Sequence, residues 1–353
     1  MSESPSGTSR GAKRLRTMLW SIVLIAVAGM LLPLSAYVWT AAVHADEAAE
    51  TEGRNPRSEY WREVRDSEPG YTAVRGQETN VLIQSGGETW REVRNGPVKI
   101  IGAIMVVGIL LALLAYHLKT GGAKLEHRTG RKVHRWSMTD RVLHWYTAVL
   151  FIVLAITGLS LLWGRSVLIP IFGKEGFAAF ASLAKPVHDY VALAFTAGLA
   201  IMLVKWFHHN LPASYDREWL RRGGGYFGTG HPPAGFANAG EKIWYWLLVV
   251  GGLALVISGF YLLFPNFGFE RAAMQTSNIV HGAIALVLCT AVIAHIYLGT
   301  LGAEGAFEGM VTGEVDEGWA RQHHSVWLDE VQQGTVRPAD TVARPVVSAG
   351  PAA

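Results

Sequence analysis

Long apolar runs separated by polar segments dominate this chain. A run of about 18 residues or more is long enough to cross the hydrocarbon core of a bilayer as a helix. Several runs reach this length, and they cover residues 19–43, 98–116, 142–163, 187–207, 243–264 and 279–301. The third, fifth and sixth contain no Asp, Glu, Lys or Arg. The pattern predicts an all-α membrane protein.

The first run allows two interpretations. Several Lys and Arg residues precede it, and Val43-His44-Ala45 follows it, which resembles a signal peptide with a small-residue cleavage site. The run is long for a signal, so an uncleaved N-terminal anchor is the alternative. Residues 1–45 are therefore a signal peptide or an anchor. In either case the chain that follows is expected on the outer side of the membrane.

The distribution of Lys and Arg sets the expected orientation. The segment 117–141 is rich in both residues, which places it in the cytoplasm. Residues 46–97, which contain the two similar units 60–65 and 89–94, then form a periplasmic segment, 98–117 a transmembrane helix and 118–141 a basic cytoplasmic linker. A four-helix domain follows at 142–302. A cytoplasmic tail covers 303–353 and is expected to be disordered at its end.

The cysteine count excludes several kinds of cofactor site. Cys289 is the only cysteine and lies inside the last apolar run. The chain therefore has no disulfide framework, no four thiolates for an iron–sulfur cluster and no Cys-x-x-Cys-His motif for covalent haem.

Four of the thirteen histidines lie inside the ends of the charge-poor helices, and they are His144, His188, His281 and His295. Ionisable residues at such depths are functional by default. On the expected topology His144 and His295 lie toward the cytoplasm, and His188 and His281 toward the periplasm. His281 and His295 share one helix. Their spacing of fourteen residues puts them on nearly one face of that helix, about 21 Å apart.

These positions predict two b-type haems, because a haem iron takes axial ligands from both faces and facing helices can supply them. We pair His188 with His281, and His144 with His295. For any one histidine the alternative is an interhelical hydrogen bond, and a metal without haem is a further alternative. His117, His208 and His209 sit at helix ends and are interpreted as interfacial.

Several spaced motifs resemble one known family. They are Arg141-Val142-Leu143-His144-Trp145, Val187-His188, Phe207-His208-His209-Asn210, Asn238-Ala239-Gly240-Glu241-Lys242, the spacing of His281 and His295, and the segment from Gly309 to Trp327 with its His323-His324 pair. Over residues 135–330 the chain resembles the gamma (cytochrome b) subunit of membrane-bound formate dehydrogenase. The N-terminal extension resembles that of the longer family members.

The resemblance implies a four-helix, di-haem cytochrome b556-type bundle in the bacterial inner membrane, in contact with lipid and not with nucleic acid. It implies as partners an iron–sulfur (beta) subunit and a molybdenum or tungsten catalytic (alpha) subunit, which would carry out formate oxidation. Electrons would pass through the two haems to a quinone, either menaquinone or ubiquinone. Asn238, Gly240 and Glu241 would line the quinone site, although relatives have Gln where this chain has Glu241.

Other interpretations stay open. A cytochrome b subunit of a hydrogenase or thiosulfate reductase shares the four-helix, two-haem plan. A transporter would use intramembrane histidines as proton or metal carriers, and a haem-free membrane anchor would have neither role. Without the resemblance, Asn238-Ala239-Gly240 is a loop and the start of a helix.

Overall fold

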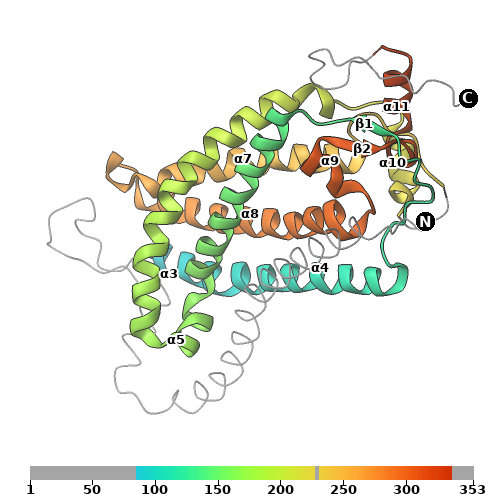
Figure 1. Ribbon diagram of the computed structural model, residues 1–353. Coiled ribbons are helices and arrows are strands. Elements are labelled where there is room, and N and C mark those ends of the chain that lie inside the picture. The colour runs from blue at the N-terminus through green and yellow to red at the C-terminus, as the bar shows by residue number, and fades with distance from the viewer. Residues whose placement is uncertain (1–84, 227–229, 336–353) are drawn as a thin grey trace, which may run out of the picture. The chain divides into compact units, whose positions relative to one another are not determined.

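A computed structural model describes residues 85–226 and 230–335 (Figure 1). The first apolar run, the unit 60–65 and the expected disordered end of the tail lie outside or largely outside these residues. The second of the two similar sequence segments, 89–94, falls in helix α3 (Ser85–Val93) and the first residue of the π-helical turn η1 (Arg94–Val98).

The long helices are α4 (Lys99–Thr120), α5 (Met138–Trp206), α7 (Ala239–Leu263) and α8 (Arg271–Tyr297), and a second π-helical turn η5 (Leu298–Gly302) extends α8. The short elements are η2 (Phe207–Asn210), α6 (Asp216–Arg221), η3 (Gly223–Gly225), η4 (Pro265–Phe267), α9 (Ala306–Thr312), α10 (Glu317–His323) and α11 (Ser325–Gln332), with strands β1 (Lys132–His134) and β2 (Glu314–Asp316).

Helix α5 consists of two helices joined at Gly173. The backbone of Gly173 has φ 73° and ψ 174°, a conformation that glycine adopts without a steric penalty and that interrupts the helix. The two parts contain the apolar runs 142–163 and 187–207. Both parts continue beyond these runs, so the helices extend past the lengths that hydropathy alone predicts.

The described residues contain four helical segments long and apolar enough to cross a membrane, at Gly86–Thr120, Met138–Asn210, Ala239–Leu263 and Arg271–Gly302. The second of these holds the break at Gly173 and two of the predicted runs. The expected all-α, multi-pass membrane fold is confirmed. A helix suits this environment because it satisfies its backbone hydrogen bonds internally.

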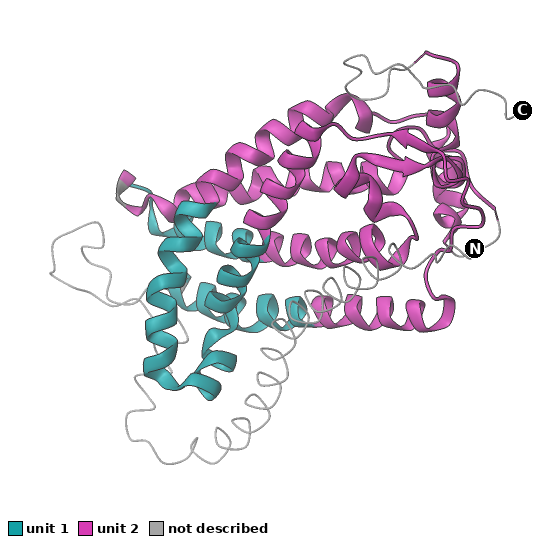
Figure 2. Ribbon diagram, viewed as in Figure 1, with its two compact units in different colours: residues 1–103, 152–191, 268–282 teal, residues 104–151, 192–267, 283–353 magenta. Residues whose placement is uncertain are grey.

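The described chain divides into two compact units, and α4, α5 and α8 each contribute residues to both (Figure 2). In the first unit, which includes 152–191 and 268–282, the two parts of α5 pack closely. A Cβ at Gly164 would lie 2.2 Å from the ring of Phe177, so only glycine allows this approach. Trp90 of α3 donates to Asn278 Oδ1 at 3.1 Å and attaches α3 to α8.

The second unit includes 104–151, 192–267 and the chain from 283 onward. Tyr146 donates to the Ala194 carbonyl at 3.0 Å, and its ring lies against Gly198, where a Cβ would be 2.6 Å away. Helices α7 and α8 approach at Gly251, which faces Leu288. The contacts of Tyr146 with Ala194 and Gly198 join the two parts of α5 in this unit as well.

A small cap belongs to the second unit, and we define it as residues 121–137 and 303–335. Strand β1 pairs antiparallel with β2, and Val133 lies opposite Val315. The buried core of the cap consists of Val315, Trp319, Ala320, Trp327 and Leu328. The cap thus has an apolar core of its own outside the apolar helices.

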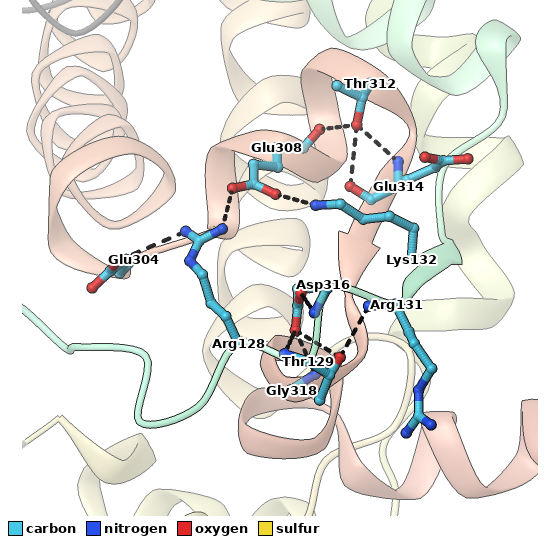
Figure 3. Close-up of polar contacts among 11 residues, drawn as sticks. Arg128, Thr129, Arg131, Lys132, Glu304, Glu308, Thr312, Glu314, Asp316 and Gly318 are labelled. Atoms are coloured by element: carbon cyan, nitrogen blue, oxygen red, sulfur yellow. Dashed lines mark hydrogen bonds and ion pairs between the residues drawn. The ribbon is translucent and has the colours of Figure 1, made fainter. Parts of the chain in front are cut away.

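Asp316 organises the loop of the cap (Figure 3). Its carboxylate accepts hydrogen bonds from the backbone of Thr129 at 3.0 Å, Gly130 at 2.9 Å and Gly318 at 2.8 Å. Burial alone would raise the pKa of Asp316, but these donors favour the charged form and hold the pKa below its usual value. The carboxylate therefore joins the basic segment 128–131 to the start of α10.

We predict that Asp316→Ala destabilises the cap by about 1–3 kcal/mol, because buried donors lose their acceptor. Because the native pKa is depressed, the stabilisation is complete above the unfolded value of about 3.9 and is lost as pH falls through the native pKa. Thermal unfolding of wild type and variant at neutral and acidic pH measures this. An undiminished difference in strong acid would contradict the assignment, and Asp329→Ala, on the exposed face of α11, is the control.

Candidate haem and quinone sites

His188 and His281 lie together in the first unit. His188 comes from the second part of α5 and His281 from α8, and their ring centroids are 6.3 Å apart. Both residues are half-buried. A Cβ at Gly158 would lie 3.0 Å from His188 Cε1, so the first part of α5 presents a bare backbone to this ring. The structure brings together the two residues that we paired from the sequence.

The hydroxyl of Thr157 determines which nitrogen of His188 is available. Thr157 Oγ1 donates to the Val153 carbonyl at 2.8 Å and lies 2.9 Å from His188 Nδ1. A hydroxyl has a single hydrogen, so Thr157 accepts the second bond from Nδ1–H. Nε2 is then unprotonated, which is the state in which an imidazole binds a metal ion.

His144 and His295 form a similar pair in the second unit. Their ring centroids are 6.2 Å apart, and the ring of Trp244 stacks on His295 at 5.2 Å and 20°. Nδ1 of His144 is buried and has no hydrogen-bond partner among the described residues. His295 is exposed, so its ring borders space that another group can fill.

The spacing within both pairs fits an iron ion bound between two imidazoles. Two ring nitrogens that each bind one metal ion at about 2 Å place their ring centroids about 6 Å apart. The observed separations are 6.2 Å and 6.3 Å. Both pairs therefore have the donor type and the separation that axial ligation of haem requires.

The three other helix-end histidines do not join these pairs. His117 Nδ1 lies 3.1 Å from the Tyr297 hydroxyl, His208 is exposed, and the ring of His209 lies 4.3 Å from that of Phe236. Aromatic side chains account for the surroundings of His117 and His209.

The Asn238 motif begins helix α7. Asn238 Oδ1 accepts from the backbone of Glu241 at 3.0 Å, and Glu241 Oε2 accepts from the backbone of Asn238 at 2.9 Å. This reciprocal pair is a capping box, which satisfies two otherwise unpaired donors at the helix start. Gly240 lies against Trp219, since a Cβ there would be 2.8 Å from the indole. The structure shows a capping role for Asn238 and Glu241, and their part in quinone binding stays a prediction.

Glu241 also faces two groups of the cap. Its Oε2 is 3.8 Å from Arg135 Nη2, and its Oε1 is 3.9 Å from His324 Nε2. Arg135 lies between the rings of Trp136, Phe236, Trp319 and Trp327, at 4.8–5.6 Å from their centroids. Burial lowers the pKa of Arg135 to about 10, which leaves the guanidinium charged at neutral pH.

An open apolar groove of about 560 Å³ lies on α5 and α9 in the second unit. Arg141 donates to the Val311 carbonyl at 2.7 Å and Trp145 to the Met310 carbonyl at 3.1 Å. The groove is lined by Met138, Arg141, Val142, Trp145, Tyr146, Val149, Leu150, Met310 and Val311. None of the residues predicted to bind quinone is among them.

Sequence reasoning missed several groups around these sites. Trp244 and Arg135 carried no recognisable signal, because stacking and an aromatic cage depend on contacts between distant segments. Thr157 was not predicted to take part in either site. Its position one residue before a glycine in a buried helix was the available indication, but the sequence does not show which helix faces it.

A family model described as prokaryotic cytochrome b561 matches residues 135–313, about half of the chain. This chain belongs to the prokaryotic cytochrome b561 family. The match begins at Arg135 and includes both histidine pairs and the Asn238 motif. As a member of a cytochrome b family, the protein binds haem b in a multi-pass membrane fold.

Curated relatives narrow the comparison. The nitrate-inducible formate dehydrogenase cytochrome b556(Fdn) subunit of Escherichia coli K12 is 26% identical over 59% of this chain and 95% of its own. The cytochrome b556(fdo) subunit of the same organism is 29% identical over 58% of this chain and 96% of its own. A formate dehydrogenase cytochrome b556 subunit of Haemophilus influenzae is 26% identical over 59% of this chain and 87% of its own.

We predict that Thr157→Val weakens haem binding at the His188–His281 pair by about 10–100-fold, because the ring loses the acceptor that orients it. Haem titration of the purified variant measures this. Thr196→Val is the matched control, since the Thr196 hydroxyl bonds the Ala192 carbonyl of its own helix. Equal affinity in the two variants would contradict the orienting role.

Proposed function

We propose that this chain is the cytochrome b subunit of a formate dehydrogenase and carries electrons from its partner subunits through two b haems to a quinone. The observation that carries the proposal is the presence of two separate imidazole pairs with centroid separations of 6.2 Å and 6.3 Å. His188 and His281 would hold one haem, and His144 and His295 the other. Each bound haem supplies a one-electron carrier whose potential depends on its ligands and their surroundings.

The protein's own residues orient the imidazole rings and exclude water from them. Thr157 holds Nδ1 of His188 and leaves Nε2 unprotonated. Trp244 covers one face of His295. Apolar helices surround both pairs, so the charge of an electron carrier is shielded from solvent and its ligands keep a fixed geometry.

The similarity to several formate dehydrogenase cytochrome b556 subunits supports the choice of partner, because the matched region covers 95% or more of two of them. The partners we propose are an iron–sulfur subunit and a molybdenum- or tungsten-containing catalytic subunit. Formate oxidation would take place in the catalytic subunit, and this chain would transfer electrons and reduce the quinone in the bacterial inner membrane.

We place the quinone, menaquinone or ubiquinone, beside Asn238, Gly240 and Glu241. The Glu241 side chain is 46% exposed although it lies next to Arg135, which is 2% exposed. An accessible carboxylate beside a buried cation is suited to binding a polar ring that takes up protons. The groove at Val142 and Val311 is the second location that an apolar quinone could occupy.

Two variants distinguish these locations. Val142→Trp fills the groove without touching Glu241, and Gly240→Ala adds a methyl group toward Trp219 and the helix start. If the quinone binds beside Glu241, Gly240→Ala raises the KM for a quinone analogue and Val142→Trp leaves it unchanged. The opposite result would assign the quinone to the groove.

The expected orientation gives the reaction an energetic consequence. Electrons arriving from a periplasmic partner and protons taken up from the cytoplasm separate charge across the membrane. Each elementary charge moved against about 100 mV stores about 2.3 kcal/mol. A cysteine introduced in segment 118–134 tests the orientation. We expect it to be labelled only from the cytoplasmic side, and labelling from the periplasmic side would mean that the orientation is the opposite.

The central experiment is a reduced-minus-oxidised spectrum with haem extraction on the purified complex. We expect two low-spin b haems per chain, with one lost in His188→Ala or His281→Ala and the other lost in His144→Ala or His295→Ala. His208→Ala is the control, because this exposed histidine belongs to neither pair. Formate should reduce both haems in the wild-type complex.

Other outcomes would redirect the assignment. Reduction by hydrogen and not by formate would indicate a hydrogenase partner, and a chain without haem would leave a transporter or an anchor. One haem per chain, lost equally in all four variants, would contradict the two-site arrangement.

A further inference from the structure

A series of titratable side chains runs through the cap from its exposed surface to Glu241. At the outer end His231 Nε2 lies 3.1 Å from Glu126 Oε1, and the Glu126 side chain is 71% exposed. At the inner end His324 is 1% exposed and its Nε2 is 3.9 Å from Glu241 Oε1. His323 precedes His324 in the chain, and both His231 and Arg135 act on it electrostatically.

The inner histidine has one nitrogen available for proton exchange. His324 Nδ1 lies 2.7 Å from the Gly235 carbonyl oxygen, which can only accept. Nδ1 therefore keeps its hydrogen, and Nε2 presents a lone pair toward Glu241. An unprotonated nitrogen and an ionised carboxylate are both acceptors, so a proton between them is required for a favourable contact. A small side-chain movement or a bridging water closes a gap of this length.

Burial favours the neutral form of both histidines of the cap. Burial, followed by the charges of His231 and Arg135, lowers the pKa of His323 to about 4. Burial, followed by Arg135, lowers the pKa of His324 well below its usual value. Both rings are neutral at neutral pH, and each can take up a proton briefly and release it.

Polar atoms without partners lie along the same route. His323 Nε2, Trp319 Nε1 and Arg135 Nη1 are buried and make no hydrogen bond among the described residues. The ring of Trp319 contacts both histidines, at 5.4 Å from His323 and 5.0 Å from His324. Buried polar groups of this kind are normally satisfied by ordered water, which also conducts protons between side chains.

Several ionisable groups face Glu241. Arg135 faces it from the segment before α5, and Lys242 follows it on α7 and is itself paired with Asp216 of α6 at 2.9 Å. Tyr226, from the segment before α7, interacts electrostatically with Glu241. Positive charge beside a carboxyl group stabilises the carboxylate that proton transfer leaves behind.

We infer that Glu126, His231, His323, His324 and Glu241 form a proton-uptake path that supplies quinone reduction at Glu241. This inference rests on the proposed quinone site. The reaction consumes two electrons, which bound haems would supply, and two protons for each quinone, and it yields a quinol. For each proton, the Glu241 O–H bond breaks as a quinol O–H bond forms, and His324 Nε2 returns a proton drawn from the exposed end.

Glu241→Gln is the decisive variant. Glutamine at this position of a capping box keeps the hydrogen bond to the Asn238 backbone, so the helix start remains stable. It cannot transfer a proton in the same way. His324→Gln tests the inner carrier, and His208→Gln is the matched control because His208 is exposed and lies outside the path.

The measurement is anaerobic stopped-flow reoxidation of the dithionite-reduced complex by duroquinone, followed by haem absorbance in H₂O and D₂O over a range of pH. We expect Glu241→Gln and His324→Gln to slow reoxidation by about 10²-fold at saturating duroquinone, the scale of lost general acid catalysis. We expect a larger solvent isotope effect in the wild type than in Glu241→Gln. The haem spectra of both variants should stay unchanged, as should every property of His208→Gln.

The two ways of failing are distinct. If wild type reacts with duroquinone and both variants match its rate and pH profile, the path is overturned and the proposed function stands. If haem is present but duroquinone does not reoxidise the wild-type complex, the proposed function fails and the path fails with it. If His324→Gln does not fold, the rate and isotope effect of Glu241→Gln still decide the question.

Discussion

The close approach of two imidazole rings from facing helices is the constraint on which the rest of this structure depends. Neighbouring helix surfaces leave room for the side chains of this region, and at two places they do so with glycine. Gly158 presents bare backbone to His188, and Gly198 does the same for Tyr146, two residues after His144. At both places a side chain would move the helix that carries or supports the histidine.

The apolar surroundings also explain how the polar side chains are used. Within the long helices, the hydroxyls of Thr157, Thr196 and Thr290 each donate to a carbonyl four residues earlier. Lipid offers them no other partner, so the donor is satisfied locally. The oxygen's lone pairs remain available, and at Thr157 one of them accepts from His188. The same hydroxyl that satisfies its own hydrogen bond within the helix therefore also orients the imidazole of His188.

The cap solves a different problem, which is to hold charge at the end of an apolar helical protein. The charged guanidinium of Arg135 is stabilised by cation–π contacts with four aromatic rings. It also donates a hydrogen bond to the Phe236 carbonyl at 2.7 Å. Glu241 is part of the helix start and also the carboxylate that faces this cation. The same side chain therefore links the stability of α7 to the electrostatics of the proposed quinone site.

The sequence by itself determined the apolar helices, the exclusion of thiolate chemistry and the identity of the four intramembrane histidines. These follow from run length and residue type, which the bilayer constrains strongly. It also suggested which histidines pair, since depth along a helix can be read from residue number. Tertiary structure alone decided that Thr157 orients His188, that Trp244 covers His295 and that Arg135 lies in an aromatic cage. Each of these depends on the direction of side chains from segments far apart in the chain, and hydropathy and spacing contain no information about that direction.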